Sequence, residues 1–137
     1  MKDIECIFCK IVEGTVPSTK IYEDESVLAF LDVNPVNVGH TLVIPKGHFK
    51  NIYETPYEII ANMIKTVKNL SEALKKTGAE GVNVAMNNDT AAGQVVFHSH
   101  VHVIPRYVND GFELWHDKRG YEEGEAQQVA KKISESL

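Results

Sequence analysis

The pattern of apolar and polar residues predicts five strands separated by turns. Short apolar runs bounded by Gly, Pro, Asn or Asp are typical of strands. The chain has such runs at residues 19–23, 26–32, 40–45, 82–86 and 97–106. The second run is apolar at successive positions, including Val27, Leu28 and Phe30, which predicts a strand buried on both faces. A turn at Asp24 and Glu25 joins the first two runs.

Two longer segments repeat apolar residues at helical spacing. At the start of the first, Thr55 can cap the helix, Pro56 suits the first helical position and Glu58 completes a capping box. Its apolar face would comprise Ile60, Met63, Ile64, Val67, Leu70 and Leu74. Gly78 follows as a stop signal. Residues 122–137 form the second predicted helix, with one face made of Ala126, Val129, Ala130, Ile133 and Leu137.

The order of these elements predicts an α+β fold. A short helical or irregular run at residues 11–16 precedes the first strand, and strands and helices then follow without regular βαβ alternation. The sequence has no internal repeat and no linker between domains. At 137 residues, the expectation is a single domain spanning residues 1–137 with one sizeable core.

Charge and cysteine content narrow the function classes. The net charge of -5 argues against a nucleic acid polymer or an anionic membrane surface as partner, whereas a small anionic ligand stays possible. The first ten residues lack the apolar stretch of a signal peptide, and no apolar run reaches membrane-spanning length. Two cysteines are too few for a secreted disulfide scaffold. We therefore expect a cytoplasmic protein.

Both cysteines lie in one C-x-x-C motif formed by Cys6 and Cys9. A thioredoxin-like redox pair normally follows a strand within a βαβ unit, and no strand is predicted before this motif. Zinc prefers four Cys or His ligands, so two histidines would have to complete a site. Zinc binding, redox chemistry and incidental use all stay open from the residues alone.

Three of the six histidines alternate within five residues, at His98, His100 and His102. Because successive side chains of a strand point to opposite faces, the three imidazoles would share one face, with Val101 and Val103 on the other. An unpaired buried polar group costs roughly 1–3 kcal/mol, so an all-imidazole face is a poor core. Histidines supply nucleophilic, acid–base and ligand chemistry, and the pattern indicates a functional site.

Two further polar features lie near this strand in the predicted order. The loop at residues 87–93 is rich in Asn and small residues and leads into the histidine strand, a favourable position for ligand contacts. Asp32 ends the second strand, where an aspartate taken alone is more often a turn-former than a site residue.

The histidine pattern resembles the His-x-His-x-His-x-x signature of the histidine triad (HIT) superfamily. The resemblance extends to residues 29–32, to Gly39 through Pro45, to Asn87 and to Ala92-Gly93-Gln94, in the order and spacing of that family. Residues 6–11 are similar to its bacterial and Hint-type members. The match reaches about Tyr107 and is loose beyond it. It implies a HIT fold, with an antiparallel sheet of about five strands, a long helix and a C-terminal helix, assembled as a two-fold homodimer.

The resemblance implies a nucleotide-binding hydrolase or transferase that attacks an α-phosphorus. His100 corresponds to the family's nucleophile, and a neutral imidazole is a good nucleophile near neutral pH. His102 and His40 correspond to supporting histidines. The expected reaction is hydrolysis of purine nucleoside phosphoramidates or related nucleotides through a nucleotidyl-histidine. The product is a mononucleotide of the AMP or GMP type, and no organic cofactor takes part.

Three further positions match substrate contacts of the family. Asp32 would hold the ribose hydroxyls, a role that suits an acceptor-only carboxylate. Gln94 and Asn87 would contact the phosphate or the leaving group. Many relatives have Ser or Thr directly after the Gln, whereas this chain has Val95, so one side-chain donor to the phosphate is missing.

The resemblance also implies a zinc site. Bacterial relatives bind zinc through positions that correspond to Cys6, Cys9, His48 and His98. Four protein ligands make a closed, structural site with no open position for water.

Three alternative functions stay in view. The same nucleophile can serve hydrolysis of dinucleoside polyphosphates. The chain can instead act as a nucleotide-sensing or partner-binding protein with weak catalysis. In the third alternative, which we rank last, His98, His100 and His102 are ligands of a catalytic metal.

Overall fold

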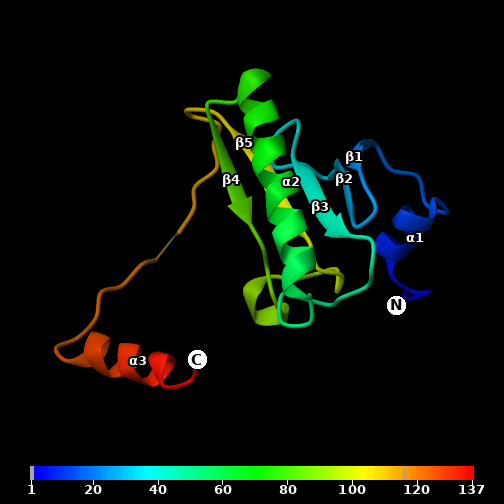
Figure 1. Ribbon diagram of the computed structural model, residues 1–137. Helices are drawn as coiled ribbons and strands as arrows, with labels where there is room; N and C mark the ends of the chain where they lie inside the picture. Colours follow the sequence, from blue (N-terminus) through cyan, green and yellow to red (C-terminus); the bar gives the residue numbers. More distant parts are fainter. Residues whose placement is uncertain (1, 116) are drawn as a thin grey trace.

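An antiparallel sheet forms the centre of the molecule, with a helix on each face (Figure 1). The computed structural model describes residues 2–115 and 117–137. Within them the sheet has five strands in the order β1-β2-β3-β5-β4. The strands are β1 (Lys20–Glu23), β2 (Val27–Leu31), β3 (Thr41–Pro45), β4 (Gly81–Ala85) and β5 (Val101–Arg106). The helices are α1 (Ile7–Glu13), α2 (Tyr57–Lys76) and α3 (Glu125–Ser134), with a 3₁₀ turn η1 at Thr90–Ala92. The predicted α+β class is confirmed.

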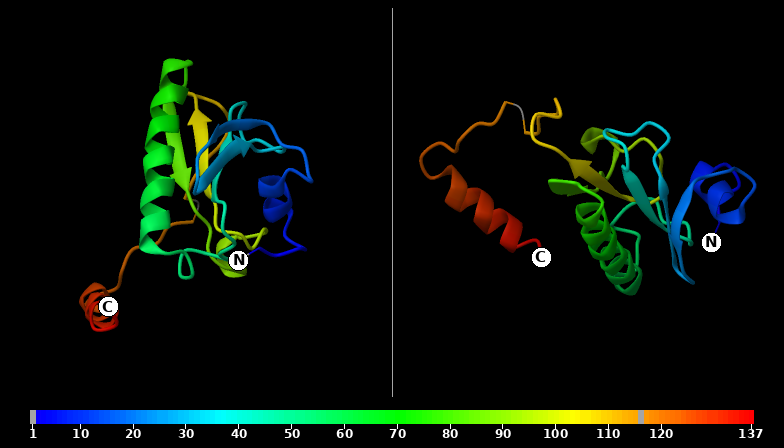
Figure 2. Two further views of the ribbon diagram at one scale, coloured as in Figure 1. Left: turned by 45° about the vertical axis from the view of Figure 1, so that its right-hand side comes forward. Right: turned by 90° about the horizontal axis from the view of Figure 1, so that it is seen from above.

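The two faces of the sheet carry separate cores. Alternate residues of β2 point to opposite faces, so Val27 and Ala29 pack with Met63 of α2, whereas Leu28 and Phe30 pack with Phe8 of α1. Figure 2 shows α2 and α1 on opposite sides of the sheet. Every residue from Val27 to Phe30 is at most 3% exposed, which confirms the prediction of a strand buried on both faces.

The pairing of strands places the histidine strand on the α1 face. Leu42 of β3 lies opposite both Phe30 of β2 and His102 of β5, and directly opposed residues of a sheet share a face. Val101 and Val103 point to the other face and join the core beneath α2. The fold therefore directs His102 towards α1, as the predicted alternation required.

Helix α1 begins earlier than predicted. It covers Ile7–Glu13 rather than residues 11–16, because the Cys6 Sγ accepts a hydrogen bond from the Cys9 backbone N–H and caps the first turn. Gly14 ends it with φ of 80°, a conformation that glycine adopts without the steric cost of a side chain. The C-x-x-C motif thus forms the first turn of a helix on the site face.

The predicted capping box of α2 is wrong. Pro56 is the N-cap residue, and no side chain caps the helix. The Thr55 Oγ1 instead donates to the Asn51 carbonyl at 2.7 Å and lies 3.0 Å from the Ser99 Oγ. The Thr55 hydroxyl, which the local pattern assigned to the helix cap, bonds to residues outside the helix instead. Thr55 therefore ties the start of α2 to the segment before β5.

The C-terminal segment leaves the body of the domain. Figures 1 and 2 show the chain after β5 running away from the sheet to α3, which stands apart from it. Helix α3 spans Glu125–Ser134 instead of the predicted residues 122–137, and none of its residues is buried. Its apolar side chains, including Val129 and Ile133, are exposed to solvent. Among the described residues, no helix is long and apolar enough to span a membrane.

Candidate active site and metal centre

A cleft of about 580 Å³ lies between α1, the sheet and the loop that precedes β5. One wall is apolar, with Phe8 and Ile11 from α1 and Phe30 and Leu42 from the sheet. The polar groups that line the cleft include Asp32, Asn87, His100 and His102. A mostly apolar cavity with a few convergent polar groups is the usual form of a small-molecule site.

The three triad histidines do not form a single stripe on one strand. The predicted strand 97–106 begins only at Val101, so His98 and His100 precede it. The backbone bends there because the Ser99 N–H donates to the Phe49 carbonyl at 2.6 Å, outside the ladder of the sheet. The rings of His100 and His102 remain in contact, with centroids 5.1 Å apart, whereas the His98 ring contacts His48 at 5.1 Å.

The hydrogen bonds of His100 fix its tautomer. Its Nδ1 lies 2.6 Å from the His98 carbonyl oxygen, which can only accept a hydrogen bond, so Nδ1 carries the proton. The lone pair therefore resides on Nε2. Burial lowers the pKa of His100 below its ordinary value of 6.5, against a smaller opposing effect of the His98 carbonyl and Asp32. His100 is consequently a neutral imidazole with a nucleophilic Nε2.

A relay of hydrogen bonds fixes the tautomer of His102 in the same way. The Val36 backbone N–H donates to His40 Nδ1 at 3.0 Å, so the proton of His40 resides on Nε2. That Nε2 lies 2.9 Å from His102 Nδ1 and donates to it. His102 must then carry its own proton on Nε2, where it is a donor available to a ligand.

Electrostatics keep this relay neutral. Burial lowers the pKa of His40, and Asp32 opposes the shift, with its Oδ2 3.7 Å from His40 Nε2. Burial, followed by His100 and His40, lowers the pKa of His102 to about 4. Neutral imidazoles can each donate one proton and accept another, as the relay requires.

Of the predicted substrate contacts, Asp32 and Asn87 line the cleft, and Gln94 does not. The Gln94 side chain is 4% exposed, and its Oε1 accepts from the Asp89 N–H at 2.8 Å. Its Nε2 lies within hydrogen-bond distance of the Lys50 and Val96 carbonyls, at 2.6 and 3.1 Å. In this structure the Gln94 amide therefore links the loop at residues 87–93 to the chain at Lys50, and its contact with a substrate stays a prediction. Val95 lines the cleft and is largely exposed.

A second cluster brings together Cys6, Cys9, His48 and His98, whose ligand atoms lie within 4.8 Å of one another. His98 Nδ1 is 3.4 Å from the Cys6 Sγ and 3.6 Å from the Cys9 Sγ, and His48 Nδ1 is 3.4 Å from the Cys9 Sγ. A tetrahedral zinc with bonds of about 2.3 Å to sulfur and about 2.0–2.1 Å to nitrogen would separate such atoms by about 3.5 Å. The donor set and its spacing fit zinc.

Outer contacts orient these four side chains. The His98 Nε2 donates to the Pro45 carbonyl at 2.8 Å, which leaves Nδ1 free for a metal. The Cys9 Sγ accepts from the Asp3 N–H at 3.4 Å, and the Cys6 Sγ accepts from the Cys9 N–H at 3.5 Å. Hydrogen bonds of this kind stabilise thiolates, the form in which cysteine binds metal.

The alternative of a catalytic metal held by all three triad histidines finds no support in the geometry. The described residues contain one further potential ligand group, formed by Asp32, His40 and His102. Hydrogen bonds already engage both ring nitrogens of His40. No ligand group among the described residues unites His98 with His100 and His102.

Sequence reasoning missed the apolar wall of the cleft. Ile7, Phe8 and Ile11 belong to the C-x-x-C segment and its helix. The interpretation of this segment from sequence considered only its two cysteines. The Phe8 ring meets His100 edge to face, with centroids 5.2 Å apart. The helical spacing of Ile7 and Ile11 was the available signal, because i and i+4 residues share one face of a helix.

Comparison with known proteins places the chain in a family. Residues 13–109 match the HIT domain model. The chain is 47% identical to the adenylylsulfatase HINT3 of Arabidopsis thaliana over 107 residues, covering 77% of this chain and 54% of that protein. A crystal structure of a HIT family member from Bacillus subtilis has 43% identity and a TM-score of 0.90, with 97% of each chain covered. A Zn-bound histidine triad family protein from Mycobacterium smegmatis has 37% identity and a TM-score of 0.78, covering 98% of this chain and 99% of that one. The chain belongs to the HIT domain family.

Proposed function

We propose that the protein hydrolyses nucleotides at the α-phosphorus, with His100 as the nucleophile and purine nucleoside 5′-phosphoramidates as the substrate class. One observation carries this proposal: His100 lines the cleft as a neutral imidazole whose Nδ1 is committed to the His98 carbonyl at 2.6 Å. An imidazole held in this tautomer attacks with its Nε2 and needs no base to activate it.

The apolar and the polar residues of the cleft suit different parts of a nucleotide. The apolar wall with Phe8 and Phe30 stacks against the base, which buries apolar surface. Asp32 accepts hydrogen bonds from the ribose hydroxyls. His102 Nε2–H and the Asn87 amide donate to phosphate oxygens, on which negative charge builds up during attack.

The reaction has two steps. First, His100 Nε2 forms a bond to the α-phosphorus while the bond from phosphorus to the leaving group breaks, and the leaving amine takes a proton from solvent as it departs. Second, water attacks the same phosphorus and releases a proton to solvent, the N–P bond breaks, and the mononucleotide leaves with the neutral imidazole restored. Splitting one displacement into two is the usual gain of nucleophilic catalysis.

The leaving group defines the finer substrate class. An Arabidopsis relative carries the name adenylylsulfatase, which favours an adenylyl group as the part transferred. Parallel assays with adenosine 5′-phosphoramidate, adenylyl sulfate and a diadenosine polyphosphate rank the three leaving groups. The highest kcat/KM is expected for the phosphoramidate. A preference for the diadenosine compound would replace this substrate class and leave the nucleophile unchanged.

Replacement of His100 tests the proposal. The His100→Ala variant is expected to lose turnover by a factor of 10³ or more, because the covalent path is removed. Adenosine monophosphate binding, measured by calorimetry, should stay within about tenfold of the unmodified protein, since the remaining contacts persist. Retained turnover would refute the nucleophile, and tight nucleotide binding without turnover in the unmodified protein would favour a sensing role.

The proposal includes a structural zinc ion held by Cys6, Cys9, His48 and His98. A zinc ion with four protein ligands would cross-link α1 to the segments after β3 and before β5, and it would have no open position for water. Metal analysis should find one zinc per chain, lost in the Cys6→Ala/Cys9→Ala double variant. Metal-free protein, purified without chelators, would refute this part.

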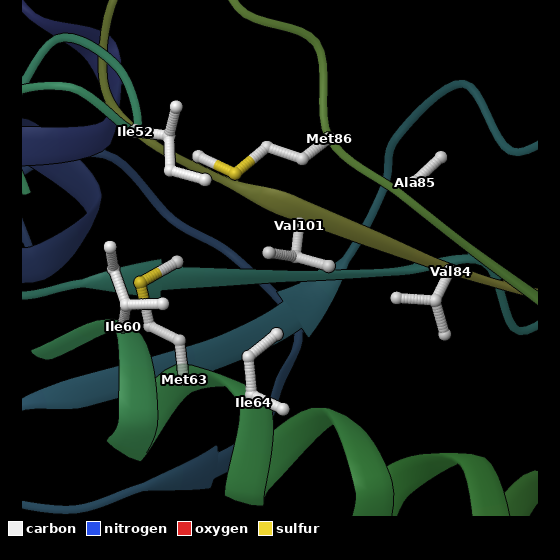
Figure 3. A pocket seen from close by; sticks show the side chains of 8 residues that line it. All are labelled: Ile52, Ile60, Met63, Ile64, Val84, Ala85, Met86 and Val101. Atoms are coloured by element: carbon white, nitrogen blue, oxygen red, sulfur yellow. The ribbon is translucent and has the colours of Figure 1, made fainter. Parts of the chain in front are cut away.

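The proposal also includes assembly as a homodimer through the face between α2 and β4. Eight apolar side chains line a depression of about 210 Å³ there, namely Ile52, Ile60, Met63, Ile64, Val84, Ala85, Met86 and Val101 (Figure 3). Strand β4 forms an edge of the sheet, and Val84 and Ile64 are about half exposed. Exposed apolar patches and unprotected sheet edges are usual sites of association.

The exposed helix α3 also favours a second copy. An isolated helix of ten residues is marginal in water, so it needs packing that its own sheet does not supply. Light scattering should give a dimer mass for the unmodified protein and a monomer mass for Ile64→Asp. Val33→Asp provides a matched control, because Val33 is exposed and lies outside the α2–β4 face. A dimer mass for Ile64→Asp would contradict the proposed interface.

A further inference from the structure

The metal cluster and the nucleophile meet at one residue. The His98 side chain belongs to the cluster, with Nδ1 3.4 Å from the Cys6 Sγ. The His98 carbonyl oxygen accepts the hydrogen bond from His100 Nδ1 at 2.6 Å, which selects the reactive tautomer. The carbonyl that selects the tautomer of His100 thus belongs to His98, the same residue whose side chain is a candidate metal ligand.

The sheet does not hold this carbonyl in place. Strand β5 begins at Val101, and its pairing with β3 starts there, three residues after His98. The segment before it is held by contacts with the last residue of β3 and with the chain after it: the His98 Nε2 donates to the Pro45 carbonyl at 2.8 Å, and the Ser99 N–H donates to the Phe49 carbonyl at 2.6 Å. In the sequence, His48, another residue of the cluster, comes between these two acceptors, Pro45 and Phe49.

Phe8 forms a second link between the two sites. It lies between the two cysteines in the first turn of α1. Its ring meets His98 edge to face with centroids 5.8 Å apart, and it meets His100 in the same way at 5.2 Å. The aromatic ring of the metal-binding turn therefore contacts both His98, the candidate metal ligand, and His100, the proposed nucleophile.

We propose that metal ligation through His98 positions the nucleophile, so that His98 acts on catalysis through its carbonyl as a positioning residue. This inference rests on the proposed function of His100. Without a metal, the thiols and imidazoles of the cluster are joined only by weak S–H hydrogen bonds. The bond from Nε2 to the Pro45 carbonyl would then be the one strong hydrogen bond of the His98 ring, which leaves the ring and the His98 carbonyl freer to move. Displacement of a reacting group by about 1 Å can lower a rate about 100-fold.

Two variants separate positioning from general support of the fold. His98→Ala and His48→Ala each remove one imidazole from the same cluster and leave three protein ligands, but only His98 carries the carbonyl that His100 uses. With both variants loaded with zinc, kcat for the phosphoramidate is expected to fall at least tenfold further in His98→Ala than in His48→Ala. KM should differ by less than about threefold, because neither residue lines the cleft. Equal losses of kcat in the two variants would overturn the proposal.

A measurement without substrate keeps this test independent of the proposed reaction. Long-range ¹H–¹⁵N NMR at pH 8 distinguishes the two neutral tautomers of His100, with His100→Gln used to assign its signals. Zinc-loaded protein should show the Nδ1–H tautomer, and chelated protein should show a mixture that reverts when zinc is restored. An unchanged Nδ1–H tautomer in folded, chelated protein would refute the coupling, even if His98→Ala failed to fold. Absence of turnover with the predicted tautomer change would refute the proposed function alone.

Discussion

Lowering the pH from 8 to 5 should destabilise the fold through His102. Burial and the neighbouring His100 and His40 lower its folded-state pKa from 6.5 to about 4. The folded protein therefore holds His102 neutral, whereas the unfolded chain takes up a proton as the pH falls below 6.5. The stability that depends on the neutral form is complete above pH 6.5 and is lost progressively towards pH 4. The two pKa values give a loss of about 2 kcal/mol at pH 5.

The His102→Gln variant isolates this contribution. Glutamine has no titrating group, so its stability should lack the part of the pH dependence that His102 provides. Urea unfolding of both proteins at pH 8 and pH 5 gives two free-energy losses, and the unmodified protein should lose about 2 kcal/mol more. Acid release of metal affects both proteins and cancels in the difference. Equal losses, within about 0.5 kcal/mol, would refute the inference that burial keeps His102 neutral.

Three further substitutions test other parts of the site. Asp32→Asn should raise KM for the nucleotide about tenfold or more in steady-state assays, because a hydrogen bond to a charged group contributes about 1.5–3 kcal/mol; an unchanged KM would exclude the ribose contact. Thr55→Val should lower the free energy of unfolding, measured in urea, by about 1–3 kcal/mol, because the Asn51 carbonyl loses its hydrogen-bond donor. A loss below about 0.5 kcal/mol would contradict this role of Thr55. Gln94→Leu should speed hydrogen exchange of the Asp89 amide at least tenfold, whereas unchanged exchange would show that Gln94 does not hold the loop.

The strands and the long helix could be predicted because their patterns are local. Val27, Leu28 and Phe30 indicated a strand buried on both faces, and both cores of the structure include that strand. Gly78, whose φ is 112°, indicated the end of α2, which stops two residues earlier at Lys76. In each case the periodicity of burial or a backbone requirement appears within a few residues of sequence.

The errors arose where a distant partner decides the local structure. Thr55 fits a capping box by sequence, yet its hydroxyl bonds to Asn51 and lies next to Ser99, 44 residues away. The alternation of His98 and His100 favoured a strand. That segment instead bonds to the Phe49 carbonyl and contacts the cysteines, so it lies outside the hydrogen-bond ladder of the sheet. Local propensity is a weak guide when tertiary contacts compete with it.

In the candidate site too, features set by local sequence could be predicted and features set by distant partners could not. The resemblance named the polar residues, because they recur at fixed spacing, whereas the tautomers depend on partners such as the Val36 N–H that no motif reveals. Gln94 matched a substrate contact by its position, and the structure shows its amide engaged with Asp89 and Lys50. The direction in which a side chain points is a property of the packed loop.

Trapping the covalent intermediate tests the central claim most directly. The protein is mixed with a nucleoside phosphoramidate, quenched in base, in which a phosphorus–imidazole bond survives, and analysed by peptide mass spectrometry. A nucleotidyl group is expected on His100, where it forms and decays at rates consistent with kcat, and it should be absent from His100→Ala. A nucleotidyl group on another residue, or turnover with no adduct during the first cycle, would contradict it.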